Sequence, residues 1–127
     1  MTLVPPILKN DTLGELTLAF DAKRKYFDEG HTRSYGFRIA ALKRLLSAIK
    51  KYDKDLKHAM YLDYKKPATE VFIGDIGVVI EDLKFTISRL REWMKPSSVP
   101  TPITIQPASS RVYYEPKGVV AIFGPWN

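Results

Sequence analysis

The sequence predicts a mixed α/β chain in which a helical region is followed by a short β-hairpin and by one strand of a parallel sheet. Three observations support this fold class. Apolar residues recur at helical spacing across most of residues 11–95, prolines cluster between residues 96 and 107, and residues 118–123 form a nearly continuous apolar run. Such a run is typical of a strand that is buried on both faces.

The first helix is expected to follow a flexible tail at residues 1–10. It should begin near Asp11 or Thr12, whose short side chains can accept a backbone N–H at a helix N-terminus. Gly30 is expected just past its end, because glycine readily adopts the left-handed conformation that closes many helices. The apolar stripe of this helix consists of Leu13, Leu16, Ala19, Phe20 and Phe27.

Two further helices are expected before Pro67. The second helix should run from about Ser34 to Lys51, since apolar residues recur there at intervals of three and four and basic residues fall between them. Asp53 is then expected as the N-cap of a short third helix that ends near Asp63. Pro67 separates this helix from the next, because proline disfavours helical backbone at the residue before it.

The longest helix is expected over residues 69–94. Gly74 and Gly77 lie inside it, and each costs about 1 kcal/mol relative to alanine, so we expect them to permit close packing. The carboxylates of this segment are expected to be solvated charges on its polar face, since adjacent helical residues do not face each other as a catalytic pair would. These carboxylates belong to Asp75, Glu81 and Asp82.

The chain changes character after residue 95. Prolines between residues 96 and 107 end the helical structure, and short strands are expected at Ile103–Ile105 and at residues 111–114, joined as a hairpin. The apolar strand at residues 118–123 then ends in a turn at Gly124-Pro125, because proline cannot donate a ladder hydrogen bond.

The composition is that of an ordinary globular protein, with 45% hydrophobic and 27% charged residues. The chain has no cysteine, which excludes disulfides, thiolate metal sites and a cysteine nucleophile within it. Its two histidines, His31 and His58, lie too far apart in the sequence to be interpreted as a metal-binding pair, so no metal site is expected.

The net charge of +6 is of the sign that attracts nucleic acid, an anionic membrane or an anionic cofactor. Basic and acidic residues are interleaved, however, so a solvated surface is the better interpretation and no nucleic-acid partner is expected. No apolar stretch approaches the roughly 20 residues of a membrane-spanning helix. Residues 1–8 also lack the basic start of a signal peptide, so cytoplasmic localisation is the default expectation.

The end of the chain carries a family resemblance. Glu115-Pro116-Lys117-Gly118-Val119-Val120, followed four residues later by Pro125-Trp126-Asn127, resembles the segment that enters the cofactor domain of aldehyde dehydrogenases. Upstream, residues 27–42, Asp63 and the amphipathic residues 71–93 are similar to the class 3 branch, which acts on fatty and aromatic aldehydes. The resemblance covers residues 15 to 127.

The resemblance implies the front of a truncated aldehyde dehydrogenase fold, which includes a Rossmann-like domain that binds a dinucleotide. Residues 11–95 would be its N-terminal helical region, and residues 96–116 a proline-rich connector with an oligomerisation-type hairpin. Residues 117–127 would be the incomplete first strand and turn of the dinucleotide-binding domain. The chain is therefore expected to be an N-terminal fragment of a parent enzyme that forms a homodimer.

The resemblance also implies roles for the last five residues. The side-chain amide of Asn127 would donate to the aldehyde oxygen as part of an oxyanion hole, and loss of such a donor typically lowers turnover about 10²–10³-fold. Phe123, Gly124, Pro125 and Trp126 would line the nicotinamide-ribose side of the cofactor cleft. The alternatives are that Asn127 caps the following helix, that Phe123 and Trp126 are core aromatics, and that Gly124-Pro125 is only a turn.

The parent enzyme would oxidise aldehydes to carboxylic acids with NAD or NADP, on medium-chain, long-chain or aromatic substrates. The family's cysteine nucleophile and glutamate base are expected downstream of Asn127, so the isolated chain is expected to be inert. Membrane association of the parent stays open, because an anchor would lie beyond this sequence.

Two other functions also stay open. One is a non-catalytic basic helical module that binds an anionic partner, whose affinity would fall steeply with added salt. The other is an interaction subunit that pairs with a full-length homologue.

Overall fold

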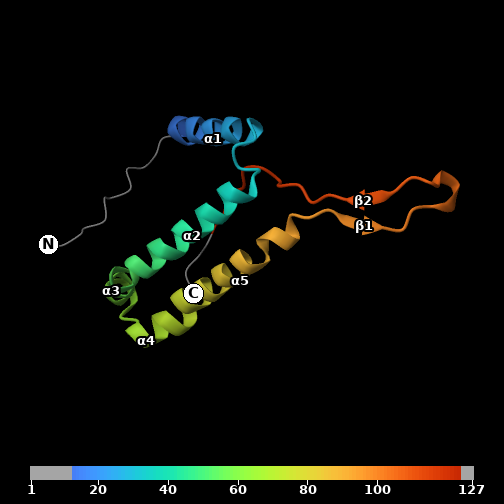
Figure 1. Ribbon diagram of the computed structural model, residues 1–127. Helices are drawn as coiled ribbons and strands as arrows, with labels where there is room; N and C mark the ends of the chain where they lie inside the picture. The colour runs from blue at the N-terminus through green and yellow to red at the C-terminus, as the bar shows by residue number, and fades with distance from the viewer. Residues whose placement is uncertain (1–12, 124–127) are drawn as a thin grey trace.

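The computed structural model describes residues 13–123 and shows a mainly helical chain with one small sheet (Figure 1). The helices are α1 (Leu13–Asp28), α2 (Tyr35–Lys51), α3 (Asp53–Tyr64), α4 (Ala68–Val71), a π-helix (Phe72–Ile76) and α5 (Gly77–Trp93). The strands are β1 (Ser97–Val99) and β2 (Ser110–Val112), with a 3₁₀ turn (Ile103–Ile105) between them. The expected tail and the expected caps Asp11 and Thr12 lie outside the described residues.

The packed centre of the structure is formed by α2 and α5, which lie side by side and run in opposite directions (Figure 1). The predicted start of the second helix near Ser34 is confirmed: Ser34 is the N-cap of α2, and its hydroxyl oxygen accepts the N–H of Phe37 at 3.1 Å. Gly30 follows α1 with a φ of +83°, which confirms the prediction for that end. Within residues 13–123, the buried apolar side chains are Val71, Ile76, Leu83 and Leu90.

The predicted long helix is interrupted by a π-helical turn. The N–H of Gly77 donates to the carbonyl oxygen of Phe72, five residues earlier. A Cβ atom at position 77 would lie 2.6 Å from that same oxygen, so only glycine fits there without a shift of the backbone. The close packing expected of the two glycines is therefore confirmed at Gly77. It is wrong at Gly74, where the nearest atom to such a Cβ is 3.9 Å away.

Two acidic residues differ from their predicted roles. Asp53 is the first residue of α3 and not its N-cap, and its carboxylate instead accepts from Lys57 at 2.7 Å. Asp75 is not a solvated surface charge. Its carboxylate lies 2.7 Å from the ammonium of Lys66, and the two side chains are 23% and 13% exposed. The ion pair joins the loop after α3 to the π-helix, a contact between residues nine positions apart.

The predicted hairpin is present, but one of its strands lies elsewhere. Ser97 pairs with Val112 and Val99 with Ser110 in an antiparallel ladder, and the resulting arm extends away from the helices (Figure 1). The strand predicted at Ile103–Ile105 is wrong, because this segment forms a 3₁₀ turn at the tip. It lies between Pro102 and Pro107, which cannot donate ladder hydrogen bonds, so pairing is confined to residues outside them.

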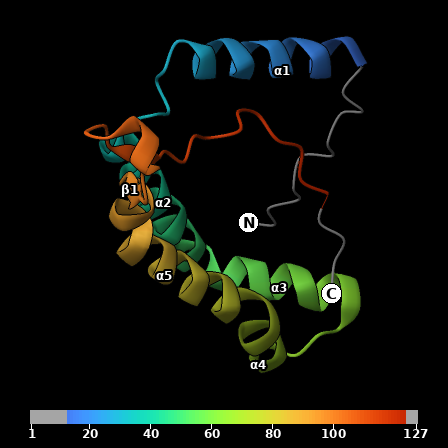
Figure 2. The same ribbon diagram turned by 90° about the vertical axis from the view of Figure 1, so that its right-hand side faces the viewer.

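The strand predicted at residues 118–123 is also absent from the described structure. Residues 113–123 have no regular secondary structure and return from the hairpin toward α1 (Figure 2). A parallel strand requires hydrogen bonds to a neighbouring strand, and no strand among residues 13–123 lies beside this segment. The α/β class is thus seen only as helices with a two-stranded sheet, and a Rossmann-like domain is not observed.

Candidate functional site

The structure describes the segment that leads to the predicted site. Of the five predicted site residues, only Phe123 is described, and its side chain is 91% exposed. Gly124, Pro125, Trp126 and Asn127 lie outside the described residues. Residues 116–119, which precede Phe123, pack against the helices.

Gly118 fixes the path of this segment. Its φ is +107°, a conformation that residues with a side chain rarely adopt. A Cβ atom at this position would also lie 3.6 Å from the ring of Phe27 on α1. In the sequence, Gly118 is the first residue of the apolar run. The signal for its special backbone was a glycine placed directly before two β-branched valines.

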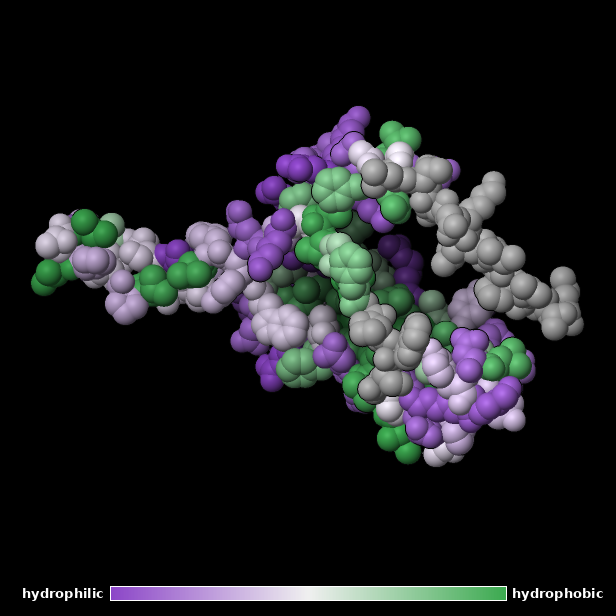
Figure 3. Space-filling model, turned by 180° about the vertical axis from the view of Figure 1, so that it is seen from behind, coloured by the Kyte–Doolittle hydropathy of each residue, from purple (hydrophilic) through white to green (hydrophobic). Residues whose placement is uncertain are grey.

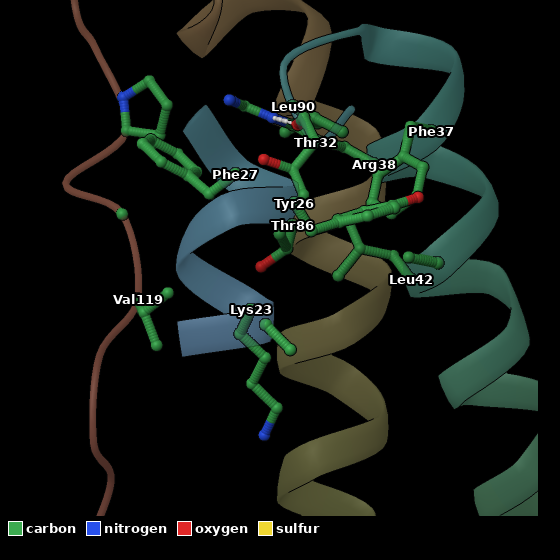
Figure 4. Close-up of a pocket in the computed structure, with 14 residues that line it drawn as sticks. Lys23, Tyr26, Phe27, Thr32, Phe37, Arg38, Leu42, Thr86, Leu90 and Val119 are labelled. Carbon is green, nitrogen blue, oxygen red and sulfur yellow. Dashed lines mark hydrogen bonds between the residues drawn. The ribbon is translucent and has the colours of Figure 1, made fainter. Parts of the chain in front are cut away.

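An apolar pocket of about 860 Å³ lies beside Gly118 (Figure 4). It is open to solvent and is lined by α1, the α1–α2 connection, α2, α5 and residues 116–119. Phe123 does not line it. The lining residues are Ala22, Lys23, Tyr26, Phe27, Thr32, Phe37, Arg38, Ala41, Leu42, Thr86, Leu90, Pro116, Gly118 and Val119.

Aromatic rings hold the connection between α1 and α2 at one wall of the pocket. The ring of Tyr26 stacks on that of His31, with centroids 4.4 Å apart, and lies 6.1 Å from the ring of Phe37. His31 also contacts the carboxylate of Glu29 at 3.1 Å. His31 is therefore half-exposed and has two side-chain partners.

Arg38 ties the same connection to α2. Its Nε donates to the backbone carbonyl of Thr32 at 2.9 Å, the hydrogen bond drawn in Figure 4. The guanidinium of Arg33 lies 5.8 Å from the centre of the Phe27 ring, within the range of a cation–π contact. These contacts orient the end of α1, and with it the Phe27 ring that Gly118 passes.

The pocket offers apolar surface and few reactive groups. Figure 3 shows apolar residues gathered around a hollow in the middle of one face, with hydrophilic residues along its rim. Within residues 13–123, no group of three or more histidine, aspartate or glutamate side chains is arranged to hold a metal ion. No helix in that part of the chain is long and apolar enough to cross a membrane. The described part of the pocket is thus mainly apolar, with Lys23, Thr32 and Arg38 among its few polar lining residues.

The sequence model of the aldehyde dehydrogenase family matches residues 9–127, which includes every predicted site residue. The chain belongs to the aldehyde dehydrogenase family. The resemblance inferred from the Glu115–Val120 block and from Pro125-Trp126-Asn127 is therefore confirmed.

Individual relatives place this chain with class 3 of the aldehyde dehydrogenases. It is 34% identical to aldehyde dehydrogenase family 3 member I1, chloroplastic, of Arabidopsis thaliana over 89% of this chain and 20% of the relative. It is 34% identical to the dimeric NADP-preferring aldehyde dehydrogenase of Canis lupus familiaris over 82% of this chain and 23% of the relative. It is also 34% identical to the 4,4'-diaponeurosporen-aldehyde dehydrogenase of Staphylococcus aureus (strain NCTC 8325 / PS 47), over 85% of this chain and 23% of the relative.

The chain spans about a fifth of the length of these curated relatives. Class 3-like membership is thus established for the residues present.

Proposed function

We propose that this chain is the N-terminal part of a dehydrogenase that oxidises aldehydes to carboxylic acids with NAD or NADP. The observation that carries the proposal is the family match, which extends through residue 127 and so includes the Pro125-Trp126-Asn127 motif. The described helices and the Gly118 segment would form the wall against which this motif is held. The isolated chain would be inert, because it contains no cysteine to attack the aldehyde.

Asn127 is the residue proposed to take part directly in catalysis. Its side-chain N–H would donate to the aldehyde oxygen when a thiolate attacks the carbonyl, and would stabilise the negative charge that develops there. An amide suits this role because it donates a hydrogen bond at any physiological pH and carries no competing charge. A cysteine outside these residues would supply the thiolate.

Phe123, Gly124, Pro125 and Trp126 are proposed to border the nicotinamide end of the dinucleotide. When bound, NAD or NADP would accept a hydride from the substrate carbon. The exposed ring of Phe123 is available for such a contact, since it packs against little of the described chain. The name of one relative includes "NADP-preferring", which supports a dinucleotide requirement without selecting between the two cofactors.

The hairpin arm is proposed to serve homodimer formation in the parent. It extends from the helices and carries exposed apolar residues, among them Val112 at its base and Ile103 at its tip. One relative is named as dimeric, which supports this role. The domain limits at residues 95, 116 and 127, the medium-chain, long-chain or aromatic substrates and the cytoplasmic localisation belong to the same proposal.

The decisive experiment is the intact mass of the native protein, measured together with its activity. We expect a mass several-fold above 14.5 kDa and aldehyde-dependent reduction of NAD or NADP by the purified native protein. The recombinant 127-residue chain should show no such activity at equal concentration. A larger native protein that oxidises no fatty or aromatic aldehyde would overturn the proposed function, and activity of the isolated chain would overturn its inertness.

A further inference from the structure

One face of α2 is basic and carries no acid. The helix contains no aspartate or glutamate, and Lys43, Arg44, Lys50 and Lys51 are all exposed. At about 100° per residue, these four cations fall on one face of the helix, within an arc of about 120°. The positions between them on this face hold the exposed small residues Gly36, Ala40 and Ser47. We call this set of seven residues the basic face.

The cations of the basic face are not neutralised by neighbouring side chains. Among residues 13–123, none of the four takes part in an ion pair. The ammonium of Lys51 lies over the ring of Tyr52 at 5.1 Å, which leaves its charge in place. The nearest acids along the chain are Asp53, which is held by Lys57 at 2.7 Å, and Asp55, one turn into α3.

The basic face also differs in kind from the other free surfaces of the helices. The free side of α5 exposes apolar residues such as Val78 and Phe85, and α1 exposes Leu18 and Phe20. Exposed apolar surfaces of this kind are suited to contact with other protein. The basic face offers only small residues and cations, so its complement is an anionic partner and not an apolar one.

We propose that the basic face of α2 binds the surface of an anionic lipid bilayer. The pairs Lys43-Arg44 and Lys50-Lys51 are separated by seven residues, or about 10.5 Å along the helix, and the small residues between them let a flat surface approach both pairs at once. Lysine and arginine near an anionic leaflet each strengthen binding by about 1 kcal/mol, which corresponds to about fivefold per cation. The binding is peripheral, and it does not depend on the proposed enzymatic function.

Charge and side-chain type favour lipid over nucleic acid at this face. Single-stranded nucleic acids are held by aromatic rings on which bases stack, and the basic face contains no aromatic residue. Base edges of a duplex are read by hydrogen-bonding side chains, and apart from its cations this face carries only Ser47. A bilayer surface needs neither stacking nor a defined register.

The test is co-sedimentation of the full chain with vesicles. Vesicles of phosphatidylcholine with roughly 30% phosphatidylserine should bind the chain, pure phosphatidylcholine vesicles should not, and binding should be lost when salt is raised from about 0.1 M to about 0.5 M. Lys43→Gln/Lys50→Gln should weaken binding about 25-fold, as expected for two cations at about fivefold each. Lys43→Arg/Lys50→Arg should retain it, which separates loss of charge from loss of folding.

The matched control is Lys95→Gln/Lys117→Gln, which removes one exposed cation just before β1 and one beside α1 and lowers the net charge by the same amount. Three outcomes would overturn the proposal. Equal weakening by both double variants would mean that net charge alone is responsible. Equal binding to neutral vesicles would mean that the exposed apolar surfaces are responsible. Tighter binding to duplex DNA than to anionic vesicles would assign the face to nucleic acid.

Discussion

The ion pair between Lys66 and Asp75 joins two residues whose pairing the sequence did not predict. The sequence places the two residues on opposite sides of Pro67 and the start of α4, where nothing in the local pattern joins them. In the structure they are 2.7 Å apart and largely shielded from water. A partly buried pair is stronger than an exposed one, because solvent and salt screen it less.

We therefore predict that Asp75→Asn lowers the free energy of unfolding by about 1–3 kcal/mol, the range for a hydrogen bond between charged groups that is partly buried. The measurement is urea titration followed by the helical circular dichroism signal. Glu81→Gln is the matched control, because Glu81 pairs with Lys84 while 72% exposed, and we expect a loss below about 1 kcal/mol. Equal effects of the two variants would refute the role of burial.

At Asn127 the prediction concerns rate and not stability. In the native enzyme that carries this chain, Asn127→Ala should lower kcat about 10²–10³-fold, because one donor to the developing oxyanion is lost. Asn10→Ala, in the expected tail, is the control and should leave kcat within about twofold. Steady-state rates of NADH or NADPH formation check both variants. An unchanged kcat for Asn127→Ala would support the alternative in which Asn127 only caps a helix.

At the scale of elements, the π-helical turn is the feature that the periodic pattern did not predict. Apolar spacing over residues 69–94 is compatible with one continuous helix, because apolar residues are dense enough around the turn to hide the one-residue shift in register that it introduces. The turn is recognised only by the hydrogen bond from Gly77 to Phe72. The turn also contacts α3, because the ammonium of Lys57 on α3 lies 4.9 Å from the centre of the Phe72 ring.

Gly77→Ala should destabilise this turn, because its Cβ would lie 2.6 Å from the Phe72 oxygen and that backbone would have to move. We expect a loss of about 1–3 kcal/mol in the free energy of unfolding, as for other overpacked sites. Gly74→Ala, where the nearest atom is the ammonium nitrogen of Lys66 at an ordinary contact distance of 3.9 Å, should instead gain about 0.5–1 kcal/mol from helix propensity. The urea midpoints of the two variants should thus move in opposite directions, and a shift in the same direction would contradict the assignment.

The hairpin shows that the partners of a strand are harder to predict from sequence than the ends of a helix. Proline positions correctly predicted where helices end and that two strands follow. They did not predict that Ser97–Val99 is the partner of Ser110–Val112, because Ser97 and Ser98 carry little strand propensity. Register in a hairpin is decided by the turn that closes it, here the 3₁₀ segment beyond Pro102.

At the scale of the whole molecule, the chain exposes more surface than a compact monomer of its mass would. Its accessible surface is 11146 Å², whereas a compact protein of 14.5 kDa is expected to expose about 6,900 Å². Exposed apolar residues include Phe72, Val78 and Phe85, which line a second groove of about 810 Å³ along α5. Exposed apolar residues that gather in one groove mark a surface that other protein covers.

The isolated chain should accordingly bind the dye ANS, with an increase and a blue shift of its fluorescence. Val78→Ser/Phe85→Ser should reduce the signal, because both side chains are more than half exposed in that groove. Ser88→Ala, at an exposed polar position of α5, should leave the signal unchanged. A monomer that binds no dye and unfolds in one sharp transition would contradict this view of the molecule.

Helical periodicity and short motifs are properties of neighbouring residues, so the helices, the prolines that end them and the family could be predicted from the sequence. The residue types of the proposed site at Phe123 to Asn127 could be read from it as well. The folded structure was needed to find the Lys66–Asp75 pair, the π-helical turn at Gly77, the strand partners and the contact of Gly118 with Phe27. These features depend on which distant segments meet, and that choice is made by packing and by backbone hydrogen bonds that no local pattern contains.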